Sequence, residues 1–208
     1  MKTKIRAIAL FGALTILASG CYPLGPEDSE ELDIVVTNFR DAYDFHGKTT
    51  YARPDKIVII TGNQQEGEDP VFIPEATAAL ILAQIDENME DLGYQQVDVS
   101  ADPDLLLTPA AWETTTIVYW YDYWYWWWGG YYPGWGYYPG YYPGYVSAYS
   151  AGTLVMGLID PVEVGANGKP LIQWTGAVNG ILTGSYDASR ISKAIDQAFD
   201  QSPYLRTN

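Results

Sequence analysis

The chain has 208 residues, of which 11 are basic and 26 acidic, with one Cys and one His. This length suits one ordinary domain, with or without tails. The net charge of −15 excludes nucleic acid as a partner and electrostatic docking on anionic lipid, because both carry negative charge. A single Cys cannot form an intramolecular disulfide, and a single His excludes most His-based catalysis and zinc chemistry.

Residues 1–20 have the pattern of an export signal peptide. Lys2, Lys4 and Arg6 make a positive start, and the apolar run that follows is too short for a membrane-spanning helix, which needs about 20 residues. The run ends in LASGC, which resembles the lipobox of bacterial lipoproteins. This resemblance implies lipidation of Cys21 by a diacylglycerol and usually an N-acyl chain such as palmitate. The alternative is an ordinary cleaved signal with a free Cys nearby.

Removal of the signal takes away 3 of the 11 basic residues, so 8 basic residues remain against 26 acidic ones and the net charge becomes −18. The familiar inner-membrane retention signal has Asp directly after the lipidated Cys. Tyr22 stands there, which favours the outer membrane. Residues 21–32 contain two prolines and four acids and predict an acidic tether. The acids resemble a surface-export signal but lie late for one, so the periplasmic and surface faces both stay open.

The first half of the domain predicts two strands and a helix. Residues 32–39 are a short run rich in β-branched residues, as in strands, and residues 51–61 predict a second strand with a buried apolar run at 56–60. A helix is expected from Pro74 to Gly93, with apolar residues spaced by four and three. Its opposite face is acidic, and we interpret that face as solvated, because neighbours on one helix cannot wrap a calcium ion. The acidic residues are Asp86, Glu87, Glu90 and Asp91.

The second half predicts further strands and a last helix. Extended segments at 95–100 and 105–108 flank Asp102-Pro103-Asp104, which we interpret as a turn rather than a metal site. Residues 151–160 and 170–178 predict a hairpin, in which Trp174 shares a face with Ile172 and Gly176 and is buried against a helix. A helix is expected at 189–201.

Together these elements predict an α+β fold. Two helices should pack on one face of a mainly antiparallel sheet of about six strands. We expect a single domain over residues 33–208, which carries an aromatic hairpin insert at 119–145.

Several short motifs, taken in order, resemble the bacterial lipoprotein family named domain of unknown function 4136 (DUF4136). The resemblance covers most of residues 33–203, and it departs at Thr175-Gly176, where the family usually has a basic residue after the Trp-type position. It implies a fold and a compartment but no activity and no catalytic residue. The motifs are Asp44-Phe45 with Thr50-Tyr51-Ala52, Leu92-Gly93-Tyr94, Pro103-Asp104-Leu105-Leu106, Gly152-Thr153-Leu154-Val155 through Asp160, and Leu171 to Gly176 around Trp174.

Residues 119–145 form the insert, in which 17 of 27 residues are Tyr or Trp. Tyr occupies odd and Trp even positions in its first half, which in a strand would place the two ring types on opposite faces. Three Tyr-Tyr-Pro-Gly units follow, and each is typical of a turn. The candidate binding residues are Tyr119, Trp120, Tyr121, Tyr123, Trp124, Tyr125, Trp126, Trp135, Tyr137, Tyr138, Tyr141 and Tyr142.

The apolar area of the insert requires a partner surface. Seventeen rings carry roughly 2,500–4,200 Å², whereas the largest exposed patch of a monomer is about 300–600 Å². One interpretation is that the rings cover each other and the sheet. The other is a recognition surface, because Tyr and Trp keep one polar end.

Three functions remain open for such a surface, and an enzyme is not among them. The insert could bind an envelope protein, stack on the sugar rings of a glycan, or lie in the membrane interface beside the lipid anchor. No cofactor, metal site or catalytic constellation is expected, and His46 lies in a polar turn. A pair of carboxylates acting as a glycosidase stays open, because the sequence does not show their spacing.

Overall fold

The computed structural model describes residues 34–61, 69–113, 152–165, 170–182 and 187–207. By its internal contacts the chain divides into two units, Met1–Leu32 and Asp33–Asn208, and all described residues lie in the second. No described helix has the length and apolar character needed to cross a membrane.

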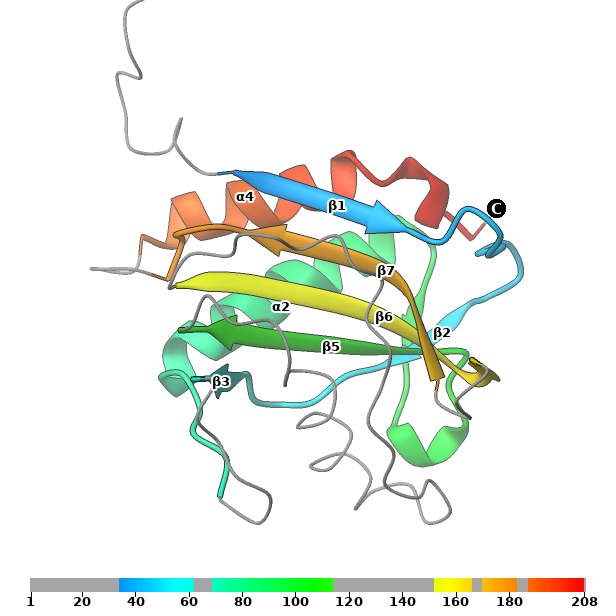
Figure 1. The fold of residues 1–208 in the computed structure, drawn as a ribbon, viewed down its shortest axis with the longest axis horizontal. Helices are drawn as coiled ribbons and strands as arrows, with labels where there is room; N and C mark the ends of the chain where they lie inside the picture. Colours follow the sequence, from blue (N-terminus) through cyan, green and yellow to red (C-terminus); the bar gives the residue numbers. More distant parts are fainter. Residues whose placement is uncertain (1–33, 62–68, 114–151, 166–169, 183–186, 208) are drawn as a thin grey trace, which may run out of the picture. The chain divides into compact units, whose positions relative to one another are not determined.

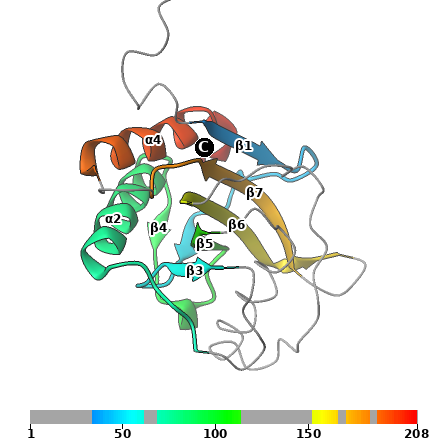
Figure 2. The ribbon, with the colours of Figure 1, turned by 60° about the vertical axis from the view of Figure 1, so that its left-hand side comes forward.

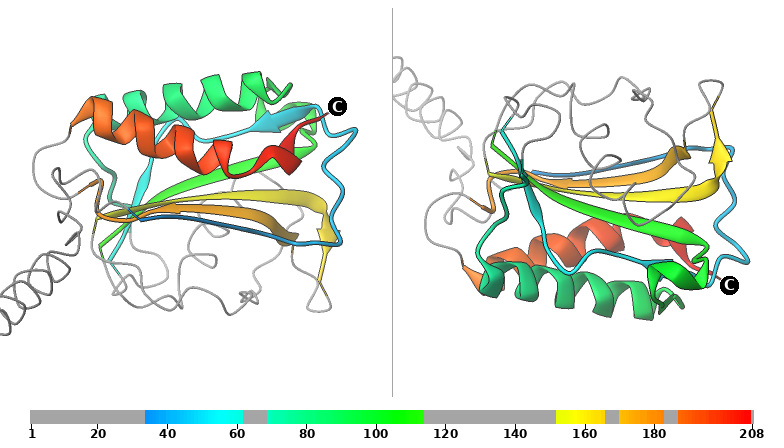
Figure 3. Two further views of the ribbon diagram at one scale, coloured as in Figure 1. Left: turned by 90° about the horizontal axis from the view of Figure 1, so that it is seen from above. Right: turned by 90° about the horizontal axis from the view of Figure 1, so that it is seen from below.

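The second unit is a seven-stranded sheet with two helices on one of its faces (Figures 1 and 3). This confirms the predicted α+β class and the placement of both helices. Along the sheet the order is β1-β7-β6-β5-β2-β4. Strand β3 also pairs with β5, along the later part of that strand, whereas β2 pairs with its start. The strands are β1 (Val35–Phe39), β2 (Thr50–Ala52), β3 (Val58–Ile60), β4 (Gln95–Gln96), β5 (Leu105–Trp112), β6 (Thr153–Val164) and β7 (Pro170–Val178).

The sheet is mixed: its long strands pair antiparallel, as predicted, and the short strands β2, β3 and β4 add parallel pairs that the sequence does not predict. The pairs β1–β7, β7–β6 and β6–β5 are antiparallel, whereas β2 and β3 both run parallel to β5, and β4 runs parallel to β2. The parallel pairing of β3 with β5 follows from the helix between them, because a crossover helix returns the chain to the same end of the sheet. The strand predicted at 51–61 is accordingly two short strands, β2 and β3, which both pair with β5.

Helix α2 (Glu75–Asp91) forms where the apolar spacing predicts it. Ala78, Leu82, Ile85 and Met89 are buried, as expected, and Ile81 joins them. The helix begins after Pro74, which has no side-chain cap, and ends before Gly93, whose φ of +99° suits a residue without a Cβ.

Helix α4 (Ala188–Asp200) lies beside α2 on the same face of the sheet (Figure 2). Polar side chains join the two helices: Gln84 and Asn88 of α2 donate to Asp196 Oδ1 at 2.8 and 2.7 Å. The chain then turns through a short 3-10 helix, Pro203–Leu205, which agrees with the expected helix end before Pro203.

The main core lies between these helices and the sheet. Trp174 of β7 is fully buried there, its ring centroid is 5.3 Å from that of Phe199 on α4, and its Nε1 donates to Ser202 Oγ at 2.8 Å. This confirms the predicted burial of Trp174 against a helix. The prediction that Ile172 shares its face is wrong, because the register shifts between Leu158 and Ile159, so Gln173 is an extra residue that turns Ile172 to the other face.

Candidate functional site

The residues predicted to carry function lie outside the described residues. They are Cys21 and the candidate binding rings Tyr119, Trp120, Tyr121, Tyr123, Trp124, Tyr125, Trp126, Trp135, Tyr137, Tyr138, Tyr141 and Tyr142. What the structure does describe is the place at which the aromatic segment joins the fold, and the surroundings of that place.

The aromatic segment, defined here as residues 114–151, connects β5 to β6. The two strands are antiparallel neighbours, and at their ends Gly152 N–H donates to the Trp112 carbonyl at 2.7 Å. On the other side, Glu113 N–H donates to the Ile60 carbonyl of β3 at 3.0 Å. The segment therefore begins and ends at the same end of the sheet. We call this place, at Glu113 and Gly152, the root of the segment; backbone hydrogen bonds hold it to the ends of β5 and β3.

Next to this root lies the sheet face that points away from the helices, which we call the second face. Its ten buried apolar members are Ala52, Val58, Ile60, Leu106, Ala110, Trp112, Val155, Ile159, Ile172 and Ala177. The strand register arranges them in rows, because residues paired directly across two strands point to the same side of a sheet.

The longest row of the second face runs across five strands. Val36 pairs with Ala177, Ala177 with Val155, Val155 with Ala110, and Ala110 with Val58. The last four are buried, but Val36 on the edge strand β1 is 50% exposed. The second face is therefore a continuous apolar surface, buried in the middle of the sheet and open at β1.

A polar cluster lies at the opposite end of β6 from the root. The side chain of Asp160 is 1% exposed, and its Oδ2 accepts from Tyr43 Oη at 2.7 Å and from Lys48 Nζ at 2.8 Å. Its Oδ1 accepts from the backbone N–H of Val162 at 2.9 Å and of Glu163 at 3.3 Å. These four bonds occupy the acceptor capacity of the carboxylate.

Electrostatics follow from this geometry. Burial by itself would raise the pKa of Asp160, but the hydrogen bonds from Lys48 and Tyr43 and the nearby ammonium bring it below the ordinary value. Burial, the bond to Asp160 and its negative charge raise the pKa of the Tyr43 hydroxyl. The cluster keeps Asp160 ionised and Tyr43 neutral, and it holds the loop after β1 against the end of β6.

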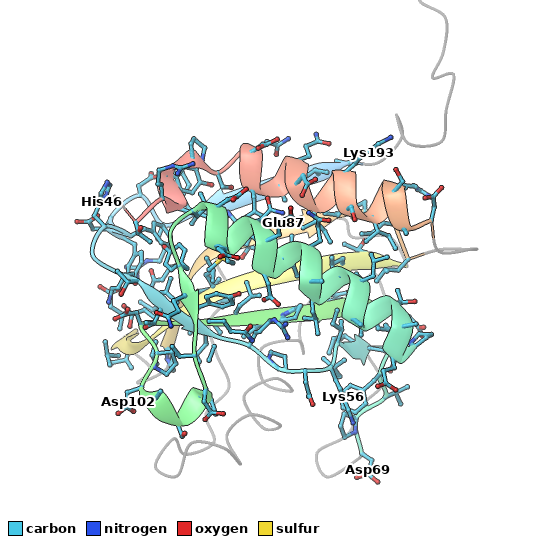
Figure 4. The ribbon with its side chains drawn as sticks, turned by 180° about the vertical axis from the view of Figure 1, so that it is seen from behind. His46, Lys56, Asp69, Glu87, Asp102 and Lys193 are labelled. Carbon is cyan, nitrogen blue, oxygen red and sulfur yellow. The ribbon has the colours of Figure 1, made fainter. Side chains whose placement is uncertain are left out.

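A second ion pair joins the loop after β2 to helix α2. Asp86 accepts from Tyr51 Oη at 2.7 Å and from Arg53 Nε at 2.6 Å, and Arg53 also donates through a second nitrogen. The prediction that Asp86 lies on a purely solvated face is therefore wrong, because Arg53 reaches it from 33 positions earlier in the chain. Glu87 and Glu90 are exposed, as predicted, and Glu87 is labelled on the outer side of α2 in Figure 4.

Asp102 and Asp104 form the predicted turn before β5. Asp102 has a φ of +51°, and Asp104 Oδ2 accepts from the backbone N–H groups of Thr49 and Thr50, each at 2.9 Å. The carboxylate thus ties the start of β2 to the start of β5. Within the described ranges, no three His, Cys, Asp or Glu side chains gather as a metal site would require.

No local sequence pattern signals these ion pairs. Lys48 and Asp160 are 112 positions apart, and Tyr43 and Asp160 are 117 apart, so only the folded chain brings them together. The carboxylates of Asp160, Asp86 and Asp104 hold loops to the sheet or to α2. The apolar second face, beside the root of the aromatic segment, is the surface that such structural contacts leave unexplained.

Known proteins share this architecture. A sequence model of the family described as "Domain of unknown function (DUF4136)" matches residues 35–204. The crystal structure of a DUF4136 family protein from Bacteroides thetaiotaomicron VPI-5482 is similar, with 27% identity and a TM-score of 0.59 over 85% of this chain and 98% of that one. No curated protein matches the chain.

Two further solved structures are more distant. The PelC dodecamer from Paraburkholderia phytofirmans has 12% identity and a TM-score of 0.40, over 85% of this chain and 99% of that chain. A PDZ domain protein from Parabacteroides distasonis ATCC 8503 has 17% identity and a TM-score of 0.38, over 82% of this chain and 35% of that one.

Proposed function

The chain belongs to the DUF4136 family, and we propose that it is an outer-membrane lipoprotein that acts as a non-catalytic binding or structural module. In this proposal Cys21 carries the lipid, residues 21–32 are a tether, and the aromatic segment contacts a protein partner in the cell envelope. The family match covers the folded unit but not the lipobox, so the anchor is supported by the signal pattern of residues 1–21.

The observation that carries the proposal is the position of the aromatic segment in the fold. A segment with 17 Tyr and Trp rings within residues 119–145 starts and ends on adjacent strands, at a root held by backbone hydrogen bonds. Binding residues commonly lie on connecting segments that a rigid scaffold positions. Tyr and Trp suit such contacts because each ring offers a large apolar area and one polar end.

A non-catalytic role is supported by how the buried carboxylate is used. Asp160 has four hydrogen-bond donors around it, so it has no free lone pair for a substrate. The bonds that Asp104 accepts join the starts of two strands. Both carboxylates therefore have a structural role in the fold.

In-cell photo-crosslinking tests the proposal. A photo-crosslinking amino acid at Tyr138 in the full-length protein should yield a covalent adduct with an envelope protein. The same group at Gln197, on the exposed side of helix α4, is the control and should not yield that adduct. Adducts from Gln197 alone, or none from Tyr138, would contradict the proposal.

A polysaccharide pull-down and liposome binding by the unlipidated protein separate the other two functions considered above. Retention on envelope polysaccharide would indicate a glycan module, because aromatic faces stack on sugar rings. Liposome binding without the lipid would indicate that the rings lie in the membrane interface.

A further inference from the structure

The second face of the sheet is buried although both described helices lie on the other face (Figure 3). Ala177 is 2% exposed, and Val155 and Ala110 are 0% exposed. The partly buried apolar side chains among the described residues that pack against this cluster are Phe72 and Val99. Two side chains cannot cover ten residues spread over five strands, so another part of the molecule must do so.

We propose that the aromatic segment 114–151 of the same chain is the layer that covers the second face. Its ends support this directly. Residue 113 leaves β5 and residue 152 enters β6, and both strands contribute buried residues to the second face. Trp112, the last residue of β5, is itself a member of that face and is completely buried. The segment therefore starts from the edge of the surface that it covers.

Charge and composition match as well. The chain as a whole has 37 charged residues in 208, but the segment has only Asp122 among its 38 residues. The buried residues of the second face carry no charge: beside the ten apolar members, strand alternation adds Thr108 and Thr153, whose hydroxyls donate to the Gly157 carbonyl and to Asn179 Oδ1. An uncharged segment rich in large rings suits an uncharged apolar surface, because burial removes both from water.

The segment is long enough for this role. Strand β5 has eight residues, so a chain that runs along the face and returns needs about 16 residues in extended form. The segment has 38, which leaves residues for its turns and for a second pass across the strands. Left uncovered, the face would expose ten apolar side chains in one continuous patch, and monomers rarely expose apolar patches beyond about 300–600 Å².

The exposed residues of β1 mark where the cover ends. Ile34 is 58% and Val36 50% exposed, whereas Ala177, the partner of Val36 on β7, is buried. The covering layer therefore lies over β7, β6, β5 and β3 and ends at the edge strand, where it covers Val36 only in part. One side of the segment then packs on the sheet, and its other side is the surface that faces outward.

Photo-crosslinking within the molecule tests this arrangement. A photo-crosslinking amino acid at Val36, at the margin of the second face, should join mainly to peptides from 114–151 of the same chain. Thr37 is the matched control, because it is next on the strand but faces the helices, as its pairing with Gly176 shows. From Thr37 the crosslinks should fall in α4, which packs against β1. Crosslinks from Val36 to a second copy, or to no part of 114–151, would overturn the proposal.

Replacement of 114–151 by a short Gly/Ser link gives an independent measurement. The shortened protein should bind the dye ANS at least several-fold more than the full chain and should melt earlier or associate, because the second face is then exposed. A shortened protein with unchanged ANS binding and melting would overturn the proposal. If it fails to fold, the Val36 crosslinks decide. The proposed function fails separately, since a segment that covers the sheet need not bind any partner.

Discussion

At the scale of single residues, Gly176 depends on its neighbour Trp174. A Cβ at position 176 would lie 2.6 Å from the Trp174 ring and 3.2 Å from the methyl group of Met156. The Trp174 ring cannot move aside easily, because it is buried and bonded to Ser202. We expect Gly176→Ala to lower the free energy of unfolding by about 1–3 kcal/mol, as overpacking of a core does. Urea denaturation measures this loss.

The double variant Gly176→Ala with Trp174→Phe supplies the control for that prediction. A smaller ring leaves room for the added methyl group, so the combined loss should be less than the sum of the two single losses. Strictly additive losses would show that the Trp174 ring does not limit the space at Gly176.

Asp160 gives a prediction about pH. Its pKa is lowered in the folded state, so between the folded and unfolded pKa values the unfolded chain binds more protons. The stability from its contacts is therefore complete above the unfolded pKa of about 3.8 and is lost as the pH falls through the folded value. We expect Asp160→Asn to cost about 1.5–3 kcal/mol at pH 6, the range for hydrogen bonds to a charged group, and much less near pH 3.

Denaturation of both proteins at a series of pH values checks this. Asp104 also has a lowered pKa, so the wild type loses stability in acid at more than one site, and only the difference between the two proteins reports on Asp160. A difference that grows as the pH falls would contradict the assigned sign.

For single residues, the sequence predicts which side chains are buried better than it predicts which residues they contact. The burial of Trp174 is predictable, because a large aromatic side chain within an apolar strand is stabilised by packing in the core. The extra residue at Gln173 reversed the face of Ile172, and no local pattern signals such a bulge. Likewise, the acidic face of α2 reads as solvated until Arg53 is seen to reach Asp86 from another element.

At the scale of elements, the two helices begin in different ways. Asp187 caps α4, since its Oδ1 accepts from Ser189 N–H at 2.9 Å and Arg190 N–H at 3.2 Å. Helix α2 follows Pro74 and has no side-chain cap. We expect Asp187→Ala to lower the free energy of unfolding by about 1 kcal/mol, measured by thermal or urea denaturation. Asp187→Asn keeps an acceptor oxygen and should lose much less; equal losses would mean that the cap bond is not the cause.

Helices were the most predictable elements, and the parallel strands the least. The four-and-three spacing in α2 and α4 extends over several turns, so the apolar face can be identified from sequence alone. Strands β2, β3 and β4 have two or three residues each, too few to show alternation. Their direction depends on α2 returning the chain across the sheet, which is a property of the whole fold.

At the scale of the whole molecule, the two faces of one sheet have different covers. The helix face is closed by α2 and α4, whose apolar sides were predictable from the sequence. The second face could not be predicted, because its members come from short runs on separate strands. The sequence indicates the aromatic segment as the candidate for function. The fold shows, in addition, that the apolar second face lies next to the root of this segment.

The last prediction concerns residues 1–32, which the internal contacts of the chain assign to a different unit from Asp33–Asn208. The first strand begins at Val35 and the family match at residue 35, so every described strand and helix follows this part of the chain. We expect the protein that begins at Asp33 to unfold within about 0.5 kcal/mol of the full chain, as for changes remote from the core. It should, however, be absent from the outer-membrane fraction.

Cys21→Ala in the full-length chain separates the anchor from the rest of the N-terminus. If the lipid holds the protein, this single change should release it from the membrane or leave it unprocessed, while its melting stays the same. Two or more acyl chains are needed for lasting attachment, because one chain binds only reversibly. If the variant stays with the outer membrane after a high-salt wash, the anchor is not the lipid. The aromatic segment would then be the part of the chain with enough apolar area to hold it there.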